Sequence, residues 1–247
     1  MKAMILAAGR GERMRPLTDT TPKPLLCVGG KPLIVWHLER LAAAGFRQVV
    51  INHAWLGDRI EACLQDGSRW GLQIAYSPEA PGGLETAGGI ATALPLLGDH
   101  PFLVVNGDIW CDWDPARAPE LARTLRSRAA QAWVLLSANP PHHPAGDFVL
   151  EPGGEPASGA PHATEVTAVF DRSARPHSPS LTFTGIGIYE PALFAGIAPH
   201  SRAPLAPLLR AAMQAGTALG SSHPSQWIDV GTPERLQQLD EAVRRAV

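Results

Sequence analysis

The stretch KAMILAAGRGER, residues 2–13, indicates how the fold begins. Residues 2–8 form an apolar run of the length of a buried strand, and two glycines follow directly. Residues 32–44 are predicted to form a helix, because proline suits the first helical turn and Gly45 lies just past the end. Residues 48–53 indicate a second strand. This β-loop-α-β order predicts an α/β fold.

Helices and strands continue to alternate along the chain. Further helices are expected at residues 56–64, 86–97, 205–215 and 233–245, and further strands at 72–77, 102–106, 132–138 and 181–189. Residues 140–179 are rich in Pro, Gly, Ser and His, which predicts a long loop region with one short strand around 166–170. The alternation favours a Rossmann-like mixed, mostly parallel sheet flanked by helices, in a single domain over residues 1–247.

The composition is typical of a cytoplasmic globular protein. A chain of 247 residues with 45% hydrophobic residues can bury a full core. Its three isolated cysteines favour neither a disulfide framework nor a zinc site, so a reducing cytoplasm is expected. No targeting or membrane segment is expected either, since the apolar start is too short for one.

Charge is distributed unevenly. The net charge of −2 argues against a nucleic-acid partner. The first 31 residues nevertheless hold six basic residues against two acidic ones, and the basic ones are Lys2, Arg10, Arg13, Arg15, Lys23 and Lys31. This local excess of positive charge suits a small polyanion.

The glycine turn indicates a phosphate site. Its glycines would let backbone N–H groups approach a phosphate, although a plain tight turn explains them equally well when taken alone. Met14 stands where a dinucleotide fingerprint needs its third glycine, and a Walker loop is also missing. Arg13 and Arg15 follow the turn, and Lys23 is held between two prolines. Cations placed in advance are what phosphoryl transfer requires.

These segments together resemble one family. A G-x-G-x-R loop (residues 9–13) followed by P-K-P-L (residues 22–25) is similar to the signature of the sugar-1-phosphate nucleotidyltransferases. The resemblance implies an enzyme that couples a nucleoside triphosphate to a sugar 1-phosphate and releases pyrophosphate. It also implies that Arg13 stabilises the leaving pyrophosphate and that Lys23 contacts the reacting phosphates. The residues implied to wrap the triphosphate are Ala8, Gly9, Gly11, Glu12, Arg13 and Lys23.

Two aspartates are candidate metal ligands. Asp108 follows a predicted buried strand in the sequence Asn-Gly-Asp, and the carboxyl ends of parallel strands are where α/β sheets bind ligands. An isolated Asn-Gly-Asp would also suit a simple turn. The resemblance implies that Asp108 and Asp229 together bind Mg²⁺, a metal that takes one or two carboxylates and phosphate oxygens. The alternative for Asp229 is a favourable charge beside a helix start.

The remaining candidate residues are implied by the resemblance alone. Residues 1–110 are expected to bind mainly the nucleotide, and residues 111–247 mainly the sugar phosphate. The nucleobase and ribose are assigned to Glu79, Thr86 and Gly88, although packing would explain the glycine almost as well. The sugar phosphate is assigned to Asn106, Asp147, Thr184 and Gly185.

Within the family, residues 52–57, 84–86 and 146–148 resemble the short N-acetylmuramate 1-phosphate uridylyltransferases of cell-wall recycling. That subgroup uses UTP. Many hexose-specific members carry Glu-Lys-Pro near a position where residues 169–173 here read VFDRS, and Arg172 is one candidate partner for the lactyl carboxylate of N-acetylmuramate. The sequence leaves the oligomeric state open.

Two alternatives remain. One is a glucose or mannose 1-phosphate nucleotidyltransferase. The other is a regulatory subunit that binds nucleotide sugars without turnover, and it is disfavoured because the implied catalytic residues Arg13, Lys23, Asp108 and Asp229 are all present.

Overall fold

The computed structural model describes residues 1–151 and 166–246. Its main sheet contains β1 (Ala3–Leu6), β4 (Gln48–His53), β5 (Gln73–Pro78), β6 (Phe102–Asn106), β8 (Ala132–Ser137), β9 (Phe148–Leu150), β10 (Thr167–Asp171), β11 (Thr182–Tyr189) and β12 (Ala218–His223). Two smaller sheets pair β2 (Cys27–Val28) with β3 (Lys31–Pro32), and β7 (Ile109–Cys111) with β13 (Trp227–Asp229). The α-helices are α1 (Leu33–Ala43), α2 (Gly57–Leu64), α3 (Glu85–Leu97), α4 (Ala118–Ser127), α5 (Leu205–Gln214) and α6 (Pro233–Ala246).

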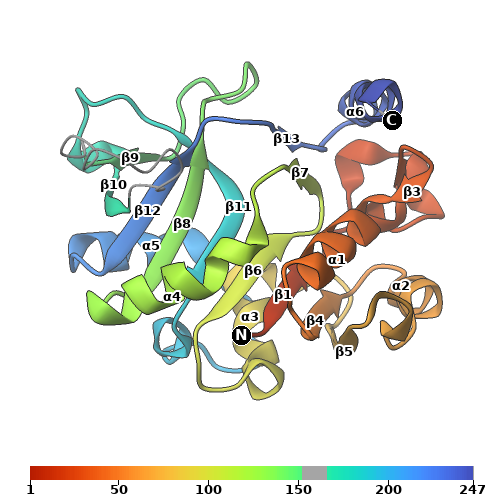
Figure 1. The fold of residues 1–247 in the computed structure, drawn as a ribbon, viewed down its shortest axis with the longest axis horizontal. Coiled ribbons are helices and arrows are strands. Elements are labelled where there is room, and N and C mark those ends of the chain that lie inside the picture. Colours follow the sequence, from red (N-terminus) through yellow and green to blue (C-terminus); the bar gives the residue numbers. More distant parts are fainter. Residues whose placement is uncertain (152–165, 247) are drawn as a thin grey trace.

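The main sheet is mixed and mostly parallel, as the sequence predicted. Its strand order is β5-β4-β1-β6-β11-β8-β12-β10-β9. Strands β5, β4, β1 and β6 are parallel neighbours, and so are β8 and β12. Strand β11 is antiparallel to both β6 and β8 and joins these two groups in the middle of the sheet (Figure 1).

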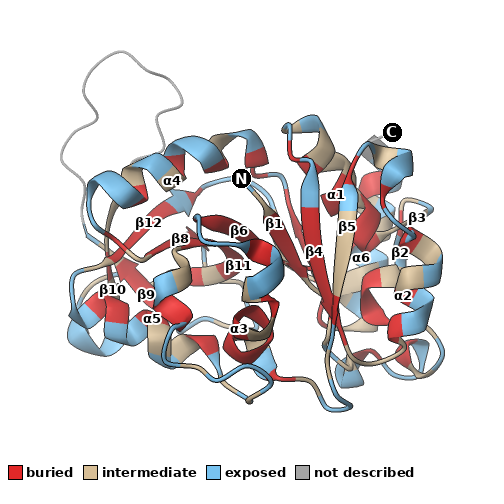
Figure 2. Cartoon of the chain, turned by 90° about the horizontal axis from the view of Figure 1, so that it is seen from below, coloured by how far each residue is buried: buried red, intermediate tan, exposed pale blue. Residues whose placement is uncertain are grey.

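Side chains of alternating strand residues fill two hydrophobic layers. In β1, Ala3 and Ile5 belong to the core that α1, α2 and α4 cover, whereas Met4 belongs to the core under α3 and α5. Successive strand side chains point to opposite faces, so an apolar strand serves both layers at once. Figure 2 shows the buried strands between the two helical layers.

The chain ends beside the N-terminal segments. Helix α6 packs on β2, where Gly29 N–H donates to Asp240 Oδ1 at 2.6 Å. Just before α6, Val230 N–H donates to Asp108 O at 3.0 Å. These contacts bring the C-terminal candidate Asp229 back to the carboxyl end of β6 (Figure 1).

The predicted elements all occur, with small shifts at their ends, but several others were missed. Helix α4, strand β12 and the short strands β7 and β13 fall in segments without a predicted element. The strand expected around residues 166–170 is β10, and it pairs with β9 in a stretch predicted as loop. That part of the prediction is therefore wrong for residues 148–150. Residues 152–165 of the predicted loop region lie outside the described residues.

Candidate active site

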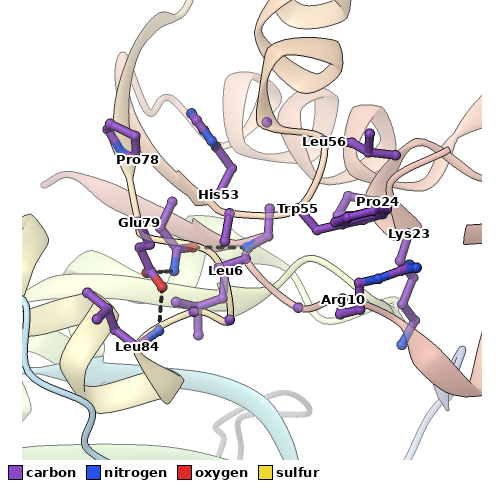
Figure 3. Close-up of a pocket in the computed structure, with 18 of the residues that line it drawn as sticks. Leu6, Arg10, Lys23, Pro24, His53, Trp55, Leu56, Pro78, Glu79 and Leu84 are labelled. Atoms are coloured by element: carbon purple, nitrogen blue, oxygen red, sulfur yellow. Dashed lines mark hydrogen bonds between the residues drawn. The ribbon is translucent and has the colours of Figure 1, made fainter. Parts of the chain in front are cut away.

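A large cavity lies at the carboxyl ends of the N-terminal parallel strands. Its volume is about 1070 Å³, which is large enough for a nucleotide-sized ligand. The lining comes from the glycine loop after β1, from residues 52–58 at the end of β4 and beyond it, from residues 78–79 and 81–86 at the end of β5 and beyond it, and from Asn106 and Asp108 at the end of β6. Figure 3 shows Arg10 and Trp55 along one wall and Glu79 beside Leu84 along another. All of these segments precede residue 110.

The glycine loop is held by a buried threonine. Gly11 adopts a left-handed conformation with φ 68°, and its carbonyl accepts a hydrogen bond from Thr18 Oγ1 at 2.8 Å. The Thr18 carbonyl in turn accepts from Arg10 Nη1 at 2.9 Å and from Trp55 Nε1 at 3.0 Å. The Arg10 guanidinium also stacks on Trp55, 3.7 Å from the ring centre. Ala8, Gly9 and Glu12 line the cavity beside it.

Lys23 and Asp108 form an ion pair on the cavity wall. Lys23 Nζ lies 2.5 Å from Asp108 Oδ2, although the two residues are 85 positions apart in the sequence. Lys23 is only 6% exposed and begins a short 3-10 turn, Lys23–Leu25, which Pro22 precedes and which contains Pro24. The predicted partners of the reacting phosphates therefore lie together.

Asp229 lies beside Asp108 because β13 pairs with β7. In that pairing Asp229 is the partner of Ile109, the residue next to Asp108. Arg235 Nη1 donates to Asp229 Oδ2 at 2.7 Å and to Asp229 O at 3.0 Å. Two partly exposed carboxylates on adjoining strands fit the hard oxygen ligands that a divalent metal such as Mg²⁺ takes alongside phosphate.

Arg13 points toward Asp229 and lies outside the cavity lining. A Cβ placed on Gly231 would lie 3.2 Å from Arg13 Nη2 and 2.7 Å from Arg235 Nη2. Two guanidinium groups therefore converge beside the Asp229 carboxylate. The sequence predicted Arg13 for this site but gave Arg235 no role.

Glu79 belongs to a hydrogen-bonded network that ties three strand ends together. Its Oε1 accepts from Asn52 Nδ2 at 2.6 Å and its Oε2 accepts from Leu84 N at 2.7 Å (Figure 3). Asn52 Oδ1 also accepts from Ala7 N at 2.9 Å. Both carboxylate oxygens of Glu79 thus hold the walls of the cavity. Asn52 had no predicted role, although it lies at the end of an apolar strand and begins the segment 52–57 that resembles the uridylyltransferase subgroup.

Thr86 and Gly88 lie in the first turns of α3 but face different surroundings. Thr86 lines the cavity. Gly88 is buried against residues 201–203, where its N–H donates to Ala203 O at 3.0 Å. A Cβ on Gly88 would lie 2.1 Å from Ser201 O. Packing of the chain therefore accounts for this glycine.

The predicted acceptor residues divide into two groups. Asn106 lines the cavity and contacts Gly185, because a Cβ on Gly185 would lie 2.5 Å from Asn106 Nδ2. The Thr184 hydroxyl is buried and donates to Leu135 O at 2.9 Å, while Thr184 O accepts from Trp227 Nε1 at 2.9 Å. Only Asn106 of these three residues therefore lines the cavity, and Thr184 and Gly185 lie behind it.

Asp147 and Arg172 line a second, smaller hollow of about 690 Å³. Asp147 accepts from Phe183 N at 2.9 Å and contacts His143 Nε2 at 3.0 Å. Arg172 Nη1 donates to Ala145 O at 3.0 Å. The structure does not bring these two residues into the first cavity.

A buried histidine lies behind the site. His37 of α1 is 8% exposed, and burial, together with the positive charge of Arg40, lowers its pKa to about 4. A backbone hydrogen bond with Ile109 and the charge of Asp108 oppose this shift in pKa. The imidazole is therefore neutral near pH 7 and adds no charge behind Asp108.

Fold and cavity together define an α/β protein with a ligand-sized cavity at the carboxyl ends of its strands, where a glycine loop and a carboxylate meet. Comparison with known sequences narrows this class. The chain belongs to the nucleotidyl transferase family, whose sequence profile matches residues 2–245. Members of this family generally use a divalent metal.

Two curated relatives match nearly the whole chain. The N-acetylmuramate alpha-1-phosphate uridylyltransferase of Neisseria meningitidis is 55% identical over 242 residues, which cover 96% of each chain. The protein of the same description from Caulobacter vibrioides is 34% identical over 94% of this chain and 92% of its own.

Solved structures share the fold. A putative glucose-1-phosphate thymidylyltransferase from Bacillus anthracis superposes with a TM-score of 0.79 at 22% identity, over 99% of this chain and 95% of that one. A UDP-glucose pyrophosphorylase in complex with UDP-glucose superposes with a TM-score of 0.73 at 20% identity, over 100% of this chain and 99% of that one. Among the helices of the described residues, none has the length and apolar character needed to cross a bilayer.

Proposed function

We propose that this chain transfers the uridylyl group of UTP to N-acetylmuramate 1-phosphate and releases pyrophosphate, forming UDP-N-acetylmuramate in the cytoplasm as a step of cell-wall recycling. The 55% identity to the Neisseria uridylyltransferase over 96% of both chains carries this proposal. A phosphate oxygen of the acceptor attacks the α-phosphorus of UTP, and the bond from that phosphorus to the bridging oxygen of the β-phosphate breaks.

Residues 1–110 bind the nucleotide in this proposal. The glycine loop, through Ala8, Gly9, Gly11 and Glu12, surrounds the triphosphate with backbone N–H groups. Thr86 and the walls fixed by Glu79 receive the base and ribose. Gly88 supports this wall from behind, by letting α3 approach residues 201–203 closely.

Two cations and two carboxylates act on the reacting phosphates in the proposed mechanism. Lys23 holds the α-phosphate and the attacking phosphate, since it is buried on the cavity wall with its ammonium group at Asp108. Arg13 stabilises the charge that develops on the departing pyrophosphate. Asp108 and Asp229 hold Mg²⁺, which when bound neutralises charge on the triphosphate.

Residues 111–247, with Asn106, bind the acceptor. Asn106 and the backbone of Thr184 and Gly185 contact the sugar phosphate. Asp147 acts from a greater distance, by fixing the Phe183 backbone at the start of β11. Arg172 is left out of this proposal, since it lines the second hollow.

A pyrophosphate-release assay with a panel of substrates tests the proposal. UTP with N-acetylmuramate 1-phosphate should give the highest kcat/KM, above N-acetylglucosamine 1-phosphate, glucose 1-phosphate and mannose 1-phosphate. A site that pairs polar groups of its acceptor rejects analogues that lack them. Mass spectrometry should identify the nucleotide sugar formed. A higher kcat/KM with glucose or mannose 1-phosphate would favour the hexose alternative, and absence of any turnover would favour a regulatory subunit.

A further inference from the structure

Each of the two carboxylates proposed to hold the metal is already paired with a cation of the chain. Lys23 neutralises Asp108, and Arg235 neutralises Asp229. The side chains of Arg235 and Asp229 are 17% and 24% exposed, so solvent screens this pair less than an ordinary surface ion pair. Each pair joins one cation to one proposed metal ligand. The family resemblance implied a function for Lys23 but none for Arg235.

Arg235 is held in place from several sides. Its backbone N–H points to Thr232 Oγ1 at 3.4 Å, at the start of α6. Its Nη1 contacts His142 Nε2 at 2.9 Å as well as two oxygens of Asp229. Its Nη2 lies near Gly231, where Arg13 Nη2 also lies. Two guanidinium groups therefore face one carboxylate, which leaves positive charge in excess.

We propose that Arg235 is a placeholder counterion that makes metal binding at Asp229 depend on the triphosphate. This inference rests on the metal site of the proposed function. A free divalent cation that approaches Asp229 is repelled by Arg235, and one that approaches Asp108 is repelled by Lys23. A triphosphate reverses this preference, because its oxygens attract Arg13, Arg235 and Lys23 away from the carboxylates.

The consequence is that metal and triphosphate enter as one complex. Arg235 moves from Asp229 Oδ2 to a phosphate oxygen next to Arg13 as the carboxylate turns to the metal. Without this exchange, the free metal would occupy the two carboxylates before UTP arrived. In the resting enzyme Arg235 therefore neutralises Asp229, and it contacts the triphosphate only after the metal–triphosphate complex has bound.

Binding of Mn²⁺, measured by the EPR signal of the free ion, tests this without turnover. Arg235→Met should bind Mn²⁺ alone about tenfold more tightly than the parent, since a repelling charge is lost. The same variant should bind Mn²⁺–UTP at least about tenfold less tightly, since a phosphate-binding cation is lost. Arg235→Lys keeps the charge and should resemble the parent for Mn²⁺ alone.

Arg245→Met is the matched control, because it removes a guanidinium from an exposed position of the same helix. It should change neither affinity. If Arg235→Met and a second neutral variant, Arg235→Gln, bind Mn²⁺ alone no more tightly than the parent, the placeholder role is wrong. Unchanged Mn²⁺–UTP affinity would overturn it as well.

Failure of the metal site itself has a different signature. Asp108→Asn and Asp229→Asn should each weaken Mn²⁺–UTP binding strongly. If neither substitution changes that affinity, the metal ligands of the proposed function are misassigned, whatever the Arg235 variants do.

Discussion

Lys23 and Arg10 both come from the cationic N-terminal segment, but their surroundings differ. Lys23 is buried and directs its ammonium group to Asp108. The Arg10 guanidinium stacks on Trp55, donates to the Thr18 carbonyl and lies 3.3 Å from Asp19 Oδ1. The charge of Lys23 therefore faces Asp108, one of the proposed metal ligands, whereas that of Arg10 stabilises the glycine loop.

Removal of each cation should separate these roles. Lys23→Ala and Arg13→Ala should each lower kcat about a hundredfold or more, as the loss of a donor to a charged transition state does. Arg10→Ala should lower it less than about tenfold, since it loses mainly a stacking contact and loop hydrogen bonds. Steady-state kinetics with saturating UTP measures this. Equal losses at positions 10 and 13 would refute the distinction.

The sequence predicted the residue types of the site better than their partners. Lys23 and Asp108 were both predicted as site residues, each from its own motif. Their ion pair was not predicted, because the fold brings together two positions that are 85 residues apart in the sequence. Arg235 and His142 carried no motif at all. Both residues reach Asp229 only because β13 and the loop after β8 come together in the fold. A contact between segments so far apart in the sequence cannot be predicted from a local sequence pattern.

At the scale of single elements, β11 connects the proposed nucleotide side of the sheet to the proposed acceptor side. Its pairing with β8 shifts register between Phe183 and Gly187, which marks a bulge. Gly185 lies within the bulge with φ 83° and packs against the Asn106 side chain. The bulge therefore places Gly185 against the last residue of β6, where the acceptor is proposed to bind.

Alanine at position 185 should disturb this alignment. Gly185→Ala adds a Cβ that collides with Asn106, so the KM for the sugar 1-phosphate should rise at least about fivefold, while the KM for UTP changes less. Gly216→Ala is the control, since its φ of 69° imposes a similar strain with no atom within 4 Å of the new Cβ. Gly216→Ala should lose about 1 kcal/mol of stability from backbone strain, and Gly185→Ala should lose more because its Cβ also collides with Asn106. A KM effect of the same size in the control would show that backbone strain alone is responsible.

The missed strands depend on tertiary contacts, whereas the missed helix carried a signal of its own. Helix α4 buries Ala118, Leu121 and Leu125, whose spacing of three and four residues is that of an amphipathic helix, so its sequence did contain the helical period. Strand β12 reads ALGSSH, a sequence of low strand propensity that is stabilised by pairing with β8 and β10. Strands β7 and β13 have three residues each and depend on one another.

Across the whole molecule, His37 links stability to pH. The folded protein binds a proton at His37 only near pH 4, whereas an unfolded chain binds it near pH 6.5. Between these values the unfolded state carries the extra proton, so stability is complete above pH 6.5 and falls as the pH drops toward 4. The shift in pKa corresponds to a loss on the order of 3 kcal/mol.

Urea unfolding of the parent and of His37→Gln, at pH 7.5 and at pH 4.5, measures this contribution. Between pH 7.5 and pH 4.5 the free energy of unfolding of the parent should fall by about 2 kcal/mol more than that of the variant, because glutamine does not titrate. Carboxylates titrate in both proteins and cancel in the difference. Identical losses would show that His37 accepts a proton in the folded state without penalty.

The central position of β11 also has a consequence for how the chain is made. Strand β6 leaves the ribosome early and pairs with β1, but its other edge stays open until residues 182–189 have been synthesised. That edge belongs to an apolar strand, the kind that recruits other chains when left unpaired. A fragment that stops at residue 110 would keep this edge permanently, so we expect residues 1–110 to aggregate when they are expressed alone.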